Sequence, residues 1–461
     1  MKTRRTRSLL LIAAVLHGLV YMLLLPPWMG EDEPWHLEYA HHISTGHAPW
    51  GGVEMYGAER EEDDDRRLMP LSQLQVRRRI GGLSTGEIRD TQARIIQSMR
   101  DEDFFRRVDF APWHGGATNF DQIQDAFTAT HQPPLYYALA ALIMKVSGAE
   151  GPLEELRNVR WLGFACYLAM IALTLSLARL VTKDLAVVAL AGFVCAWLPM
   201  HARQAAVVNN DVLAKVVGGA LLMAGAYQLS IKQGRLSLAS VLTLLALIVF
   251  AFATKTTTLA CVVCAGFAYV AAPARGDAGK TLLAALACGG VLAVGYGYWR
   301  YMHSPSLPTN WEDMSERIGR GLSTTNLEEL WRTSVGAFNW YSRDLPSGLS
   351  SALLFMASLI CLGALWRIYS PKRNDRVMLL MCFAAVLAQV AMITVRGVSA
   401  GRYLFPVLPA IAVLAAVGMN ALGPVMTRKR VVSGLVIGLI AYDAVFLWRG
   451  LLVEQYLVWG D

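Results

Sequence analysis

"SLLLIAAVLHGLVYMLLLPPW", residues 8–28, is the stretch that decides the fold of this chain. It contains no Asp, Glu, Lys or Arg, and it is long enough to cross the roughly 30 Å hydrocarbon core of a bilayer. The basic segment "MKTRRTR" precedes it, as in a secretory signal. The run is too long for the apolar core of such a signal, and no small-residue cleavage site follows. We therefore interpret it as an uncleaved first membrane helix.

The composition is typical of a chain that crosses the membrane many times. Of its 461 residues, 55% are hydrophobic and 17% are charged, whereas soluble domains carry about a quarter charged residues. Apolar runs recur along the chain and, with the first, predict about twelve spans. They occupy residues 133–148, 157–180, 185–200, 205–229, 236–254, 257–273, 281–299, 348–368, 377–395, 403–422 and 431–449. We predict an all-α integral membrane protein, a bundle of about 11–12 transmembrane helices with two long outer-face loops.

Two long connections divide the chain into regions. The predicted regions are the first helix (1–28), a large outer loop (29–132), a transmembrane core (133–299), a second outer loop (300–347) and C-terminal helices (348–461). Basic residues in the N-terminal segment and in short turns such as "ARLVTKD" and "IKQGR" are typical of cytoplasmic positions. Both long loops then lie outside, provided that residues 133–148 do not cross the membrane completely. The net charge of +7 follows from these basic turns and does not indicate nucleic-acid binding.

A cluster of carboxylates follows the first span, in "MGEDEPWHLEYAHH". Asp32 suits the N-cap of a helix, and Pro34 is tolerated in the first turn. Asp32 and Glu33 precede His36 by four and three residues, so the three side chains can share one side of that helix. We predict a short helix at the outer membrane surface. Its acids either cap the helix or provide a general base for an acceptor hydroxyl at the lipid–water boundary.

Further short motifs follow in order: "HQPPLYYAL", "LPMHARQAAVVNNDVL", "ATKTT" and "GRYLFPVLP". With the acidic start, this series resembles the GT-C superfamily of multi-pass glycosyltransferases, over residues 26 to about 418. The resemblance is strongest to bacterial membrane proteins with an Asp-Glu-x-x-His motif near the start and a Gly-Arg-Tyr motif near the end. The chain is more distantly similar to protein O-mannosyltransferases and to the transferase that adds aminoarabinose to lipid A. Each motif is short, so their order and membrane context carry the match.

The resemblance implies an enzyme at the outer face of the bacterial cytoplasmic membrane. Such enzymes take a sugar from a polyprenyl-phosphate carrier and invert the anomeric centre, and an acidic residue of the first outer loop is the base. On this chain the resemblance implies Asp32 as the catalytic base and Glu33 as a partner that orients the base or the acceptor. The acceptor is a lipid, a glycan or a protein, and membrane lipids surround the enzyme.

Basic residues near the predicted outer ends of other spans are candidates for binding the donor. Lys255 and Arg402 suit the donor phosphate, because an ammonium and a planar guanidinium both bind phosphate oxygens. Lys255 alternatively anchors its helix at the membrane interface. Tyr403, next to Arg402, suits stacking on the sugar or hydrogen bonding to it.

A polar cluster lies near the end of an otherwise apolar helix, in "VVNNDVLAK". Polar groups at membrane depth are costly and usually line a cavity, which favours substrate binding by Asn210 and Asp211. The alternative is a structural ion pair between Asp211 and Lys215, four residues apart. Arg203 precedes this cluster and is a further candidate for contact with the donor.

Three candidates lie in the two long loops. His131 stands where the first loop returns to the membrane, and it either faces the cavity or is structural. Trp340 and Tyr341 either stack on sugar rings or anchor the second loop at the membrane surface. With His36, they complete the predicted substrate-binding residues. The histidines that follow His36 do not have a defined metal-site spacing, so we predict no metal ligand and leave a divalent cation open as cofactor.

Two other classes of protein compete with the glycosyltransferase. A multi-pass transporter would show matching halves and charges near mid-membrane, whereas this chain shows no internal repeat and its charges gather near one face. A lipid-linked glycan polymerase or ligase would use similar carriers and basic residues. Carrier turnover, as opposed to solute flux, separates the enzymes from the transporter.

Overall fold

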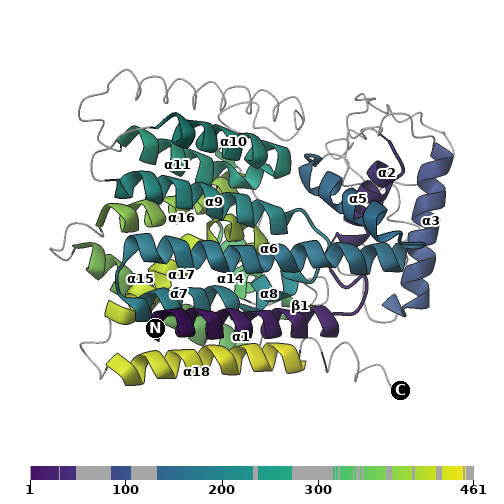
Figure 1. The fold of residues 1–461 in the computed structure, drawn as a ribbon. Helices are drawn as coiled ribbons and strands as arrows, with labels where there is room; N and C mark the ends of the chain where they lie inside the picture. Colours follow the sequence, from purple (N-terminus) through teal and green to yellow (C-terminus); the bar gives the residue numbers. More distant parts are fainter. Residues whose placement is uncertain are drawn as a thin grey trace.

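The protein is described here by a computed structural model that is almost entirely helical. It describes residues 2–30, 32–47, 85–104, 132–231, 237–271, 315–316, 318–319, 322–335, 337–338, 343–344, 347–369, 376–396, 400–421, 428–449 and 452. Long helices lie side by side in one bundle (Figure 1). They are α1 (Lys2–Leu24), α6 (Pro152–Val181), α7 (Leu185–Ala196), α9 (Asp211–Ser230), α10 (Leu238–Thr254), α11 (Leu259–Ala271), α15 (Ser347–Tyr369), α16 (Arg376–Arg396), α17 (Leu408–Ala421) and α18 (Arg428–Phe446). The prediction of an all-α membrane fold is confirmed.

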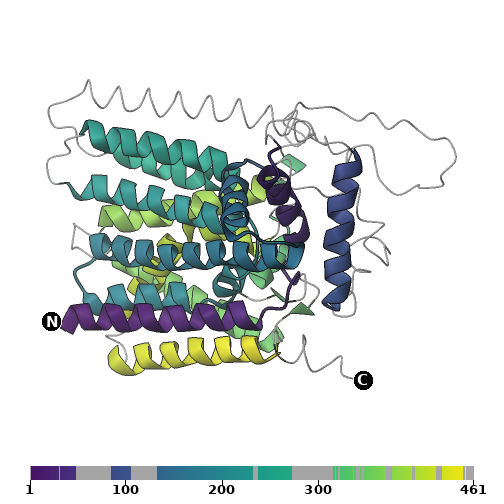
Figure 2. The ribbon, with the colours of Figure 1, turned by 45° about the vertical axis from the view of Figure 1, so that its right-hand side comes forward.

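Shorter elements complete the fold. Helices α2 (Glu33–Ser44), α3 (Thr85–Asp101) and α5 (Leu135–Ser147) gather at one end of the bundle, which we call the α2 end (Figures 1 and 2). In both views α3 stands across the direction of the bundle helices. The other short elements are α8 (Pro199–Ala205), α14 (Thr324–Val335), the 3₁₀ helices η4 (Thr256–Thr258) and η6 (Gly401–Val407), and two antiparallel strands, β1 (Ala337–Phe338) and β2 (Arg343–Asp344).

Some helices of the bundle have the length of membrane spans, and the surface of the bundle is apolar. Among the described residues, four are long and apolar enough to cross a membrane, or five if α7 and α8, bent by 58°, form one broken span. Several others, including α10 and α15, contain shorter apolar helices of 10–17 residues. Large apolar side chains on the bundle surface, such as Leu23, Phe267 and Trp366, are exposed, as expected for groups that face lipid. The predicted span at 281–299 lies outside the described residues.

The α5 helix is too short to cross the membrane. Its 13 residues extend for about 20 Å at the α-helical rise, less than the hydrocarbon core. It lies beside α2, at the α2 end of the bundle (Figure 1). The prediction that both long loops lie outside the membrane requires that residues 133–148 do not cross it completely, and this short helix is consistent with that requirement.

The chain between α7 and α9 is broken by a short helix and a non-helical segment, which lie near the α2 end. The sequence predicts two continuous helices over 185–200 and 205–229, but the first ends at Ala196 and the second begins at Asp211. Pro199 starts the short α8 helix instead, because proline fits a first helical turn but not a helix interior. The non-helical segment 206–210 is buried, and irregular backbone at membrane depth is tolerated only inside the protein.

Polar side chains join the first helix to the last described one. Asp443 of α18 lies 2.8 Å from His17 Nε2 and accepts a hydrogen bond from the Tyr21 hydroxyl at 2.7 Å. The other ring nitrogen of His17 lies 3.2 Å from the Tyr167 hydroxyl of α6. All four side chains are buried, so α1 and α18, which run side by side in Figures 1 and 2, are linked within the bundle.

A close approach between α6 and the broken span generates a stability prediction. A Cβ atom at Gly163 would lie 2.3 Å from the carbonyl oxygen of Ala205, so Gly163→Ala must displace backbone. Overpacking of this kind costs about 1–3 kcal/mol, and we expect a lower thermal midpoint in detergent. The control is Gly438→Ala on α18, where a Cβ atom meets open space and alanine favours the helix. Equal midpoints for the two variants would contradict the tight packing.

Candidate functional site

A buried ion pair joins the start of α2 to α6. Glu33 is the first residue of α2 and is 0% exposed. Arg160 donates from Nε to Glu33 Oε1 at 2.9 Å and from Nη2 to Oε2 at 2.8 Å. Two parallel charge-assisted hydrogen bonds are the strongest and most directional form of a guanidinium–carboxylate pair. The orientation of Glu33 is therefore determined by α6.

The same ion pair holds the surrounding backbone. The Arg160 guanidinium also donates to the carbonyl oxygens of Leu25 and Pro26, just after α1 ends. The carboxylate accepts from the backbone nitrogens of Gly30 at 3.1 Å and Val208 at 2.9 Å. The end of α1, the start of α2, α6 and the segment 206–210 consequently meet at one point.

Asp32 directs its carboxylate away from this pair. Its backbone is left-handed, with φ 62° and ψ 7°, a conformation that Asp tolerates better than most residues. It occupies the predicted N-cap position, but its side chain makes no capping hydrogen bond, so the predicted capping role is wrong. Instead Oδ2 accepts from Arg402 Nη2 at 2.7 Å, and 40% of the Asp32 side chain is exposed. The carboxylate is both ion-paired and accessible.

A second carboxylate lies near the same arginine. Asp211, the first residue of α9, pairs with Lys255 Nζ at 2.7 Å, and its other oxygen lies 3.7 Å from Arg402 Nε. Lys255 also donates to Asn210 Oδ1 at 3.0 Å, so it points into the protein rather than toward the interface. No ion pair forms between Asp211 and Lys215, whose Nζ has no hydrogen-bond partner among the described residues. The predicted structural pair is therefore wrong.

Four charged side chains lie in a row in which positive and negative charges alternate. We call this cluster the ion row, and its order is Lys255, Asp211, Arg402, Asp32. Its members come from the end of α10, the start of α9, η6 and the start of α2. The Tyr403 ring lies beside both cations, with Lys255 Nζ 5.2 Å and Arg402 Cζ 5.5 Å from its centre, distances suited to cation–π attraction. Segments far apart in the sequence thus assemble one charged site at the α2 end.

Protonation at the start of α2 follows from this environment. Burial raises the pKa of Asp32, but the charge and the hydrogen bond of the Arg402 guanidinium, together with the positive charge of Lys255, hold the pKa below its usual value. Burial lowers the pKa of His36 to about 3. The ring of His36 stacks on Tyr137, and its Nδ1 lies 2.7 Å from the Tyr137 hydroxyl. Near neutral pH, Asp32 is an ionised carboxylate and His36 a neutral imidazole.

One of the other two histidines of α2 connects it to neighbouring helices. His41 Nδ1 lies 2.8 Å from Glu155 of α6, and its Nε2 accepts from Arg94 of α3 at 2.9 Å. His42 lies 3.7 Å from Glu38 one turn earlier. Within the described ranges, no group of three or more His, Cys, Asp or Glu side chains is arranged to hold a metal ion. His41 thus links α2 to both α3 and α6.

The remaining predicted site residues differ in position. Arg203 is buried and donates from Nη2 to the carbonyl oxygen of Met29 at 3.2 Å, so it supports the loop before Asp32. Asn210 Nδ2 donates to Gln132 Oε1 at 3.2 Å, which ties the ion row to the segment before α5. Three others, His131, Trp340 and Tyr341, lie outside the described residues, and their roles stay predictions.

Two residues at this site were missed by sequence analysis. Arg160 stands in "NVRWLGF", near the start of an apolar run, and a charge within a predicted span is itself a signal of a buried partner. Tyr137 was not singled out because "LYYAL" resembles an ordinary interfacial aromatic pair. Both side chains contact α2 from other helices.

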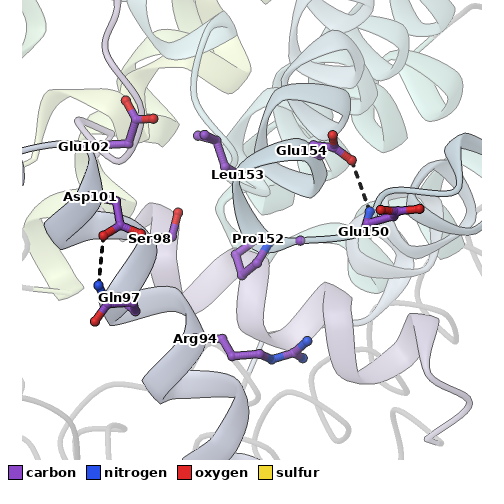
Figure 3. Close-up of a pocket in the computed structure, with 10 residues that line it drawn as sticks. Arg94, Gln97, Ser98, Asp101, Glu102, Glu150, Pro152, Leu153 and Glu154 are labelled. Atoms are coloured by element: carbon purple, nitrogen blue, oxygen red, sulfur yellow. Dashed lines mark hydrogen bonds between the residues drawn. The ribbon is translucent and has the colours of Figure 1, made fainter.

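A separate cavity lies at the α2 end, between α3 and the start of α6 (Figure 3). Its volume is about 510 Å³. Acidic side chains predominate in its lining, which consists of Arg94, Gln97, Ser98, Asp101, Glu102, Glu150, Gly151, Pro152, Leu153 and Glu154. Gln97 donates to Asp101, and the Glu150 backbone nitrogen donates to Glu154. None of the ion-row residues lines this cavity.

Comparison with known proteins gives one family and one fold. A family described as "Predicted membrane protein (DUF2142)" matches residues 15–411. No curated protein matches the chain. Among solved structures, the chain is similar to the oligosaccharyltransferase AglB of Archaeoglobus fulgidus in complex with an inhibitory peptide and a dolichol-phosphate, with a TM-score of 0.50 and 11% identity over 99% of this chain and 56% of that chain.

Two further structures of the Archaeoglobus fulgidus oligosaccharyltransferase match less closely. One is tethered to an acceptor peptide, with a TM-score of 0.46 and 11% identity over 94% of this chain and 54% of that chain. The other is the apo form, with a TM-score of 0.46 and 10% identity over 98% and 55%. The chain thus spans about half the length of the solved structures it matches, and at this identity the likeness concerns the fold.

The buried ion pair generates a second stability prediction. Arg160→Met leaves the Glu33 carboxylate buried without its cation, which costs about 3–5 kcal/mol. We expect a large fall in the thermal midpoint in detergent, or loss of the folded protein. The control is Arg157→Met, one turn earlier on the same helix, where the side chain is exposed. Similar midpoints for the two variants would show that the pair is not a major contact.

The pKa of His36 generates a prediction about pH. Between pH 6.5 and about 3 the unfolded imidazole binds a proton that the folded one does not, so acidification destabilises the fold. From pH 7 to pH 5 this amounts to on the order of 2 kcal/mol. In His36→Gln the thermal midpoint should fall less over this interval than in wild type. Tyr137→Phe, which retains the imidazole, should keep the wild-type pH dependence, and an unchanged fall in His36→Gln would refute the prediction.

Proposed function

The chain belongs to the DUF2142 family of predicted membrane proteins, and from that membership, its fold and the ion row we propose that it is a membrane glycosyltransferase. The proposed reaction moves a sugar from a polyprenyl-phosphate-linked donor to a cell-envelope acceptor, with inversion of the anomeric centre. The observation that carries the proposal is the contact of 2.7 Å between the accessible Asp32 carboxylate and Arg402. It brings a base and a phosphate-binding group together at one end of a membrane bundle.

The donor class is supported by chemistry and by the related fold. Two cations of the ion row, Lys255 and Arg402, suit a phosphate that is held near the membrane surface by its lipid tail. The AglB structure with the same fold contains a dolichol-phosphate, which is a polyprenyl phosphate. The acceptor is a hydroxyl of a lipid, glycan or protein.

The reaction requires one proton transfer and one displacement. Asp32 takes the proton of the acceptor hydroxyl while the acceptor oxygen attacks the anomeric carbon. The bond from that carbon to the phosphate oxygen breaks, and its electron pair stays on the phosphate. Lys255 and Arg402 stabilise the charge that develops there. No protonation of the leaving group is needed, because phosphate is a good leaving group.

Arg402 links donor binding to the strength of the base. In the free protein its guanidinium keeps Asp32 ionised but also lowers its basicity, because the pKa of Asp32 lies below the usual range. A donor phosphate competes with Asp32 for the same guanidinium. Once the phosphate binds Arg402, the Asp32 carboxylate becomes a stronger base. Proton transfer is then favoured only when donor is present.

Glu33 acts as a positioning residue in this mechanism. Its oxygens are occupied by Arg160 and by two backbone nitrogens, so it is not free to accept the acceptor proton. It fixes the backbone that carries Asp32. This supports the division of roles in which Asp32 is the base and Glu33 its orienting partner.

The outer face of the bacterial cytoplasmic membrane is the proposed side of the reaction. The basic N-terminal segment begins α1, and Lys183 lies in the turn between α6 and α7. Both are remote along their helices from the α2 end. Because basic connections face the cytoplasm, the α2 end and the ion row face outward.

Asp32→Asn tests the assigned base. With purified protein and a panel of polyprenyl-phosphate sugars, we expect carrier turnover to fall by about 100-fold or more, the usual contribution of a positioned general base. Asp90→Asn is the matched control, because Asp90 is an exposed aspartate on α3, and it should keep wild-type turnover. Full activity of Asp32→Asn would exclude Asp32 as the base. Absence of turnover in wild type, together with solute flux in vesicles, would support a transporter instead.

A further inference from the structure

Lys215 is buried in the bundle without a hydrogen-bond partner. It lies in the second turn of α9 and is 2% exposed, and no described residue accepts a hydrogen bond from its Nζ. Its Nζ lies 4.9 Å from the centre of the Phe405 ring, in the same 3₁₀ helix as Arg402. An ammonium group at membrane depth is costly unless it is paired. The mechanism above does not use it.

Asp211 lies one turn before Lys215 on the same helix. Residues four apart on a helix have neighbouring side chains, so rotamer changes alone can bring the two into contact. In the free protein Asp211 pairs with Lys255 and lies near Arg402 instead. Its carboxylate therefore holds the two cations that the proposed donor phosphate requires.

Donor binding would leave Asp211 short of a counter-ion. A phosphate that draws Lys255 and Arg402 toward itself weakens both of their contacts with Asp211, which is 3% exposed. A buried carboxylate without a partner costs several kcal/mol. Lys215 can replace the lost cations. It is buried, it shares a helix face with Asp211, and its Nζ has no hydrogen-bond partner among the described residues.

We infer that Lys215 is a positioning residue that becomes the counter-ion of Asp211 when a lipid-linked phosphate takes Lys255 and Arg402. This inference rests on the proposed function. It assigns Lys215 a role in binding the phosphate of the donor without direct contact, through the release of two cations. The Lys215 ammonium, which lacks a hydrogen bond in the free protein, thus pairs with Asp211 in the complex.

Lys215→Met separates this role from a purely structural one. Removing an unpaired buried charge should raise the thermal midpoint in the absence of ligand. The same change should weaken binding of geranylgeranyl monophosphate, used as a probe for the phosphate half of the donor, by at least about tenfold, because Asp211 is then left unpaired in the complex. A structural ion pair would lower both stability and affinity. The opposite directions are the signature of the proposed role.

Gln228→Met is the matched control. Gln228 is 0% exposed on the same helix, and neither side-chain polar atom has a hydrogen-bond partner in the described structure. It lies 13 residues beyond Lys215, about 20 Å along the helix. Its replacement should raise the thermal midpoint and leave probe binding unchanged.

The outcomes distinguish the inference from the proposed function. A lower midpoint for Lys215→Met, or probe affinity equal to that of wild type, would overturn the role of Lys215 and leave the glycosyltransferase standing. If wild type binds no probe and turns over no polyprenyl-phosphate sugar, the proposed function and this inference both fall. Weaker probe binding with a higher midpoint, while Gln228→Met binds normally, is the expected result.

Discussion

The Glu33–Arg160 ion pair is the contact on which the geometry of the α2 end depends. A carboxylate with no exposed surface needs a full set of donors, and the Arg160 guanidinium and two backbone nitrogens supply them. The same guanidinium binds the backbone just after α1. Asp32 immediately precedes Glu33, so the fixed backbone between α1 and α2 limits the directions in which the Asp32 carboxylate can point. The ion pair that fixes Glu33 therefore also determines the direction of the Asp32 carboxylate.

In the ion row, the two middle charges share their partners, so neither depends on a single dedicated counter-ion. Asp211 and Arg402 each face two opposite charges, and they come from separate segments. Each charge of the row faces an opposite charge in the free protein, yet the contact of Arg402 with Asp211, at 3.7 Å, is long and the Asp32 side chain is partly open to solvent. An added anion can therefore enter by exchange of partners, and the inferred role of Lys215 is to replace the cations that Asp211 then loses.

Local spacing and residue type were enough to predict part of this site. The apolar run of residues 8–28 and the acids after it correctly indicated an apolar helix followed by a short helix, and Lys255 and Arg402 were identified from their motifs. What the sequence could not indicate was partner choice. The spacing of Asp211 and Lys215 favours a local pair, but the tertiary fold brings Lys255 closer to Asp211. The break before α9 was missed, although Asn209 and Asn210 interrupt the apolar run at that point.

Arg160 was missed for a related reason. Its value to the fold appears only when α6 is placed beside the end of α1, and no pattern within its own run reveals that neighbour. The prediction of an N-cap role for Asp32 failed because a distant arginine competes with the local backbone donors. In both cases a contact between remote segments overrides a local preference.

The polar link between α1 and α18 has a consequence for biogenesis. His17 and Tyr21 enter the bilayer with α1, whereas Asp443 is synthesised 426 residues after His17. Until then, α6 supplies the Tyr167 hydroxyl to His17, but the Tyr21 hydroxyl lacks its acidic partner. Completion of this part of the bundle is thus a ring closure, in which α1 finds its acidic neighbour only after α18 has been synthesised.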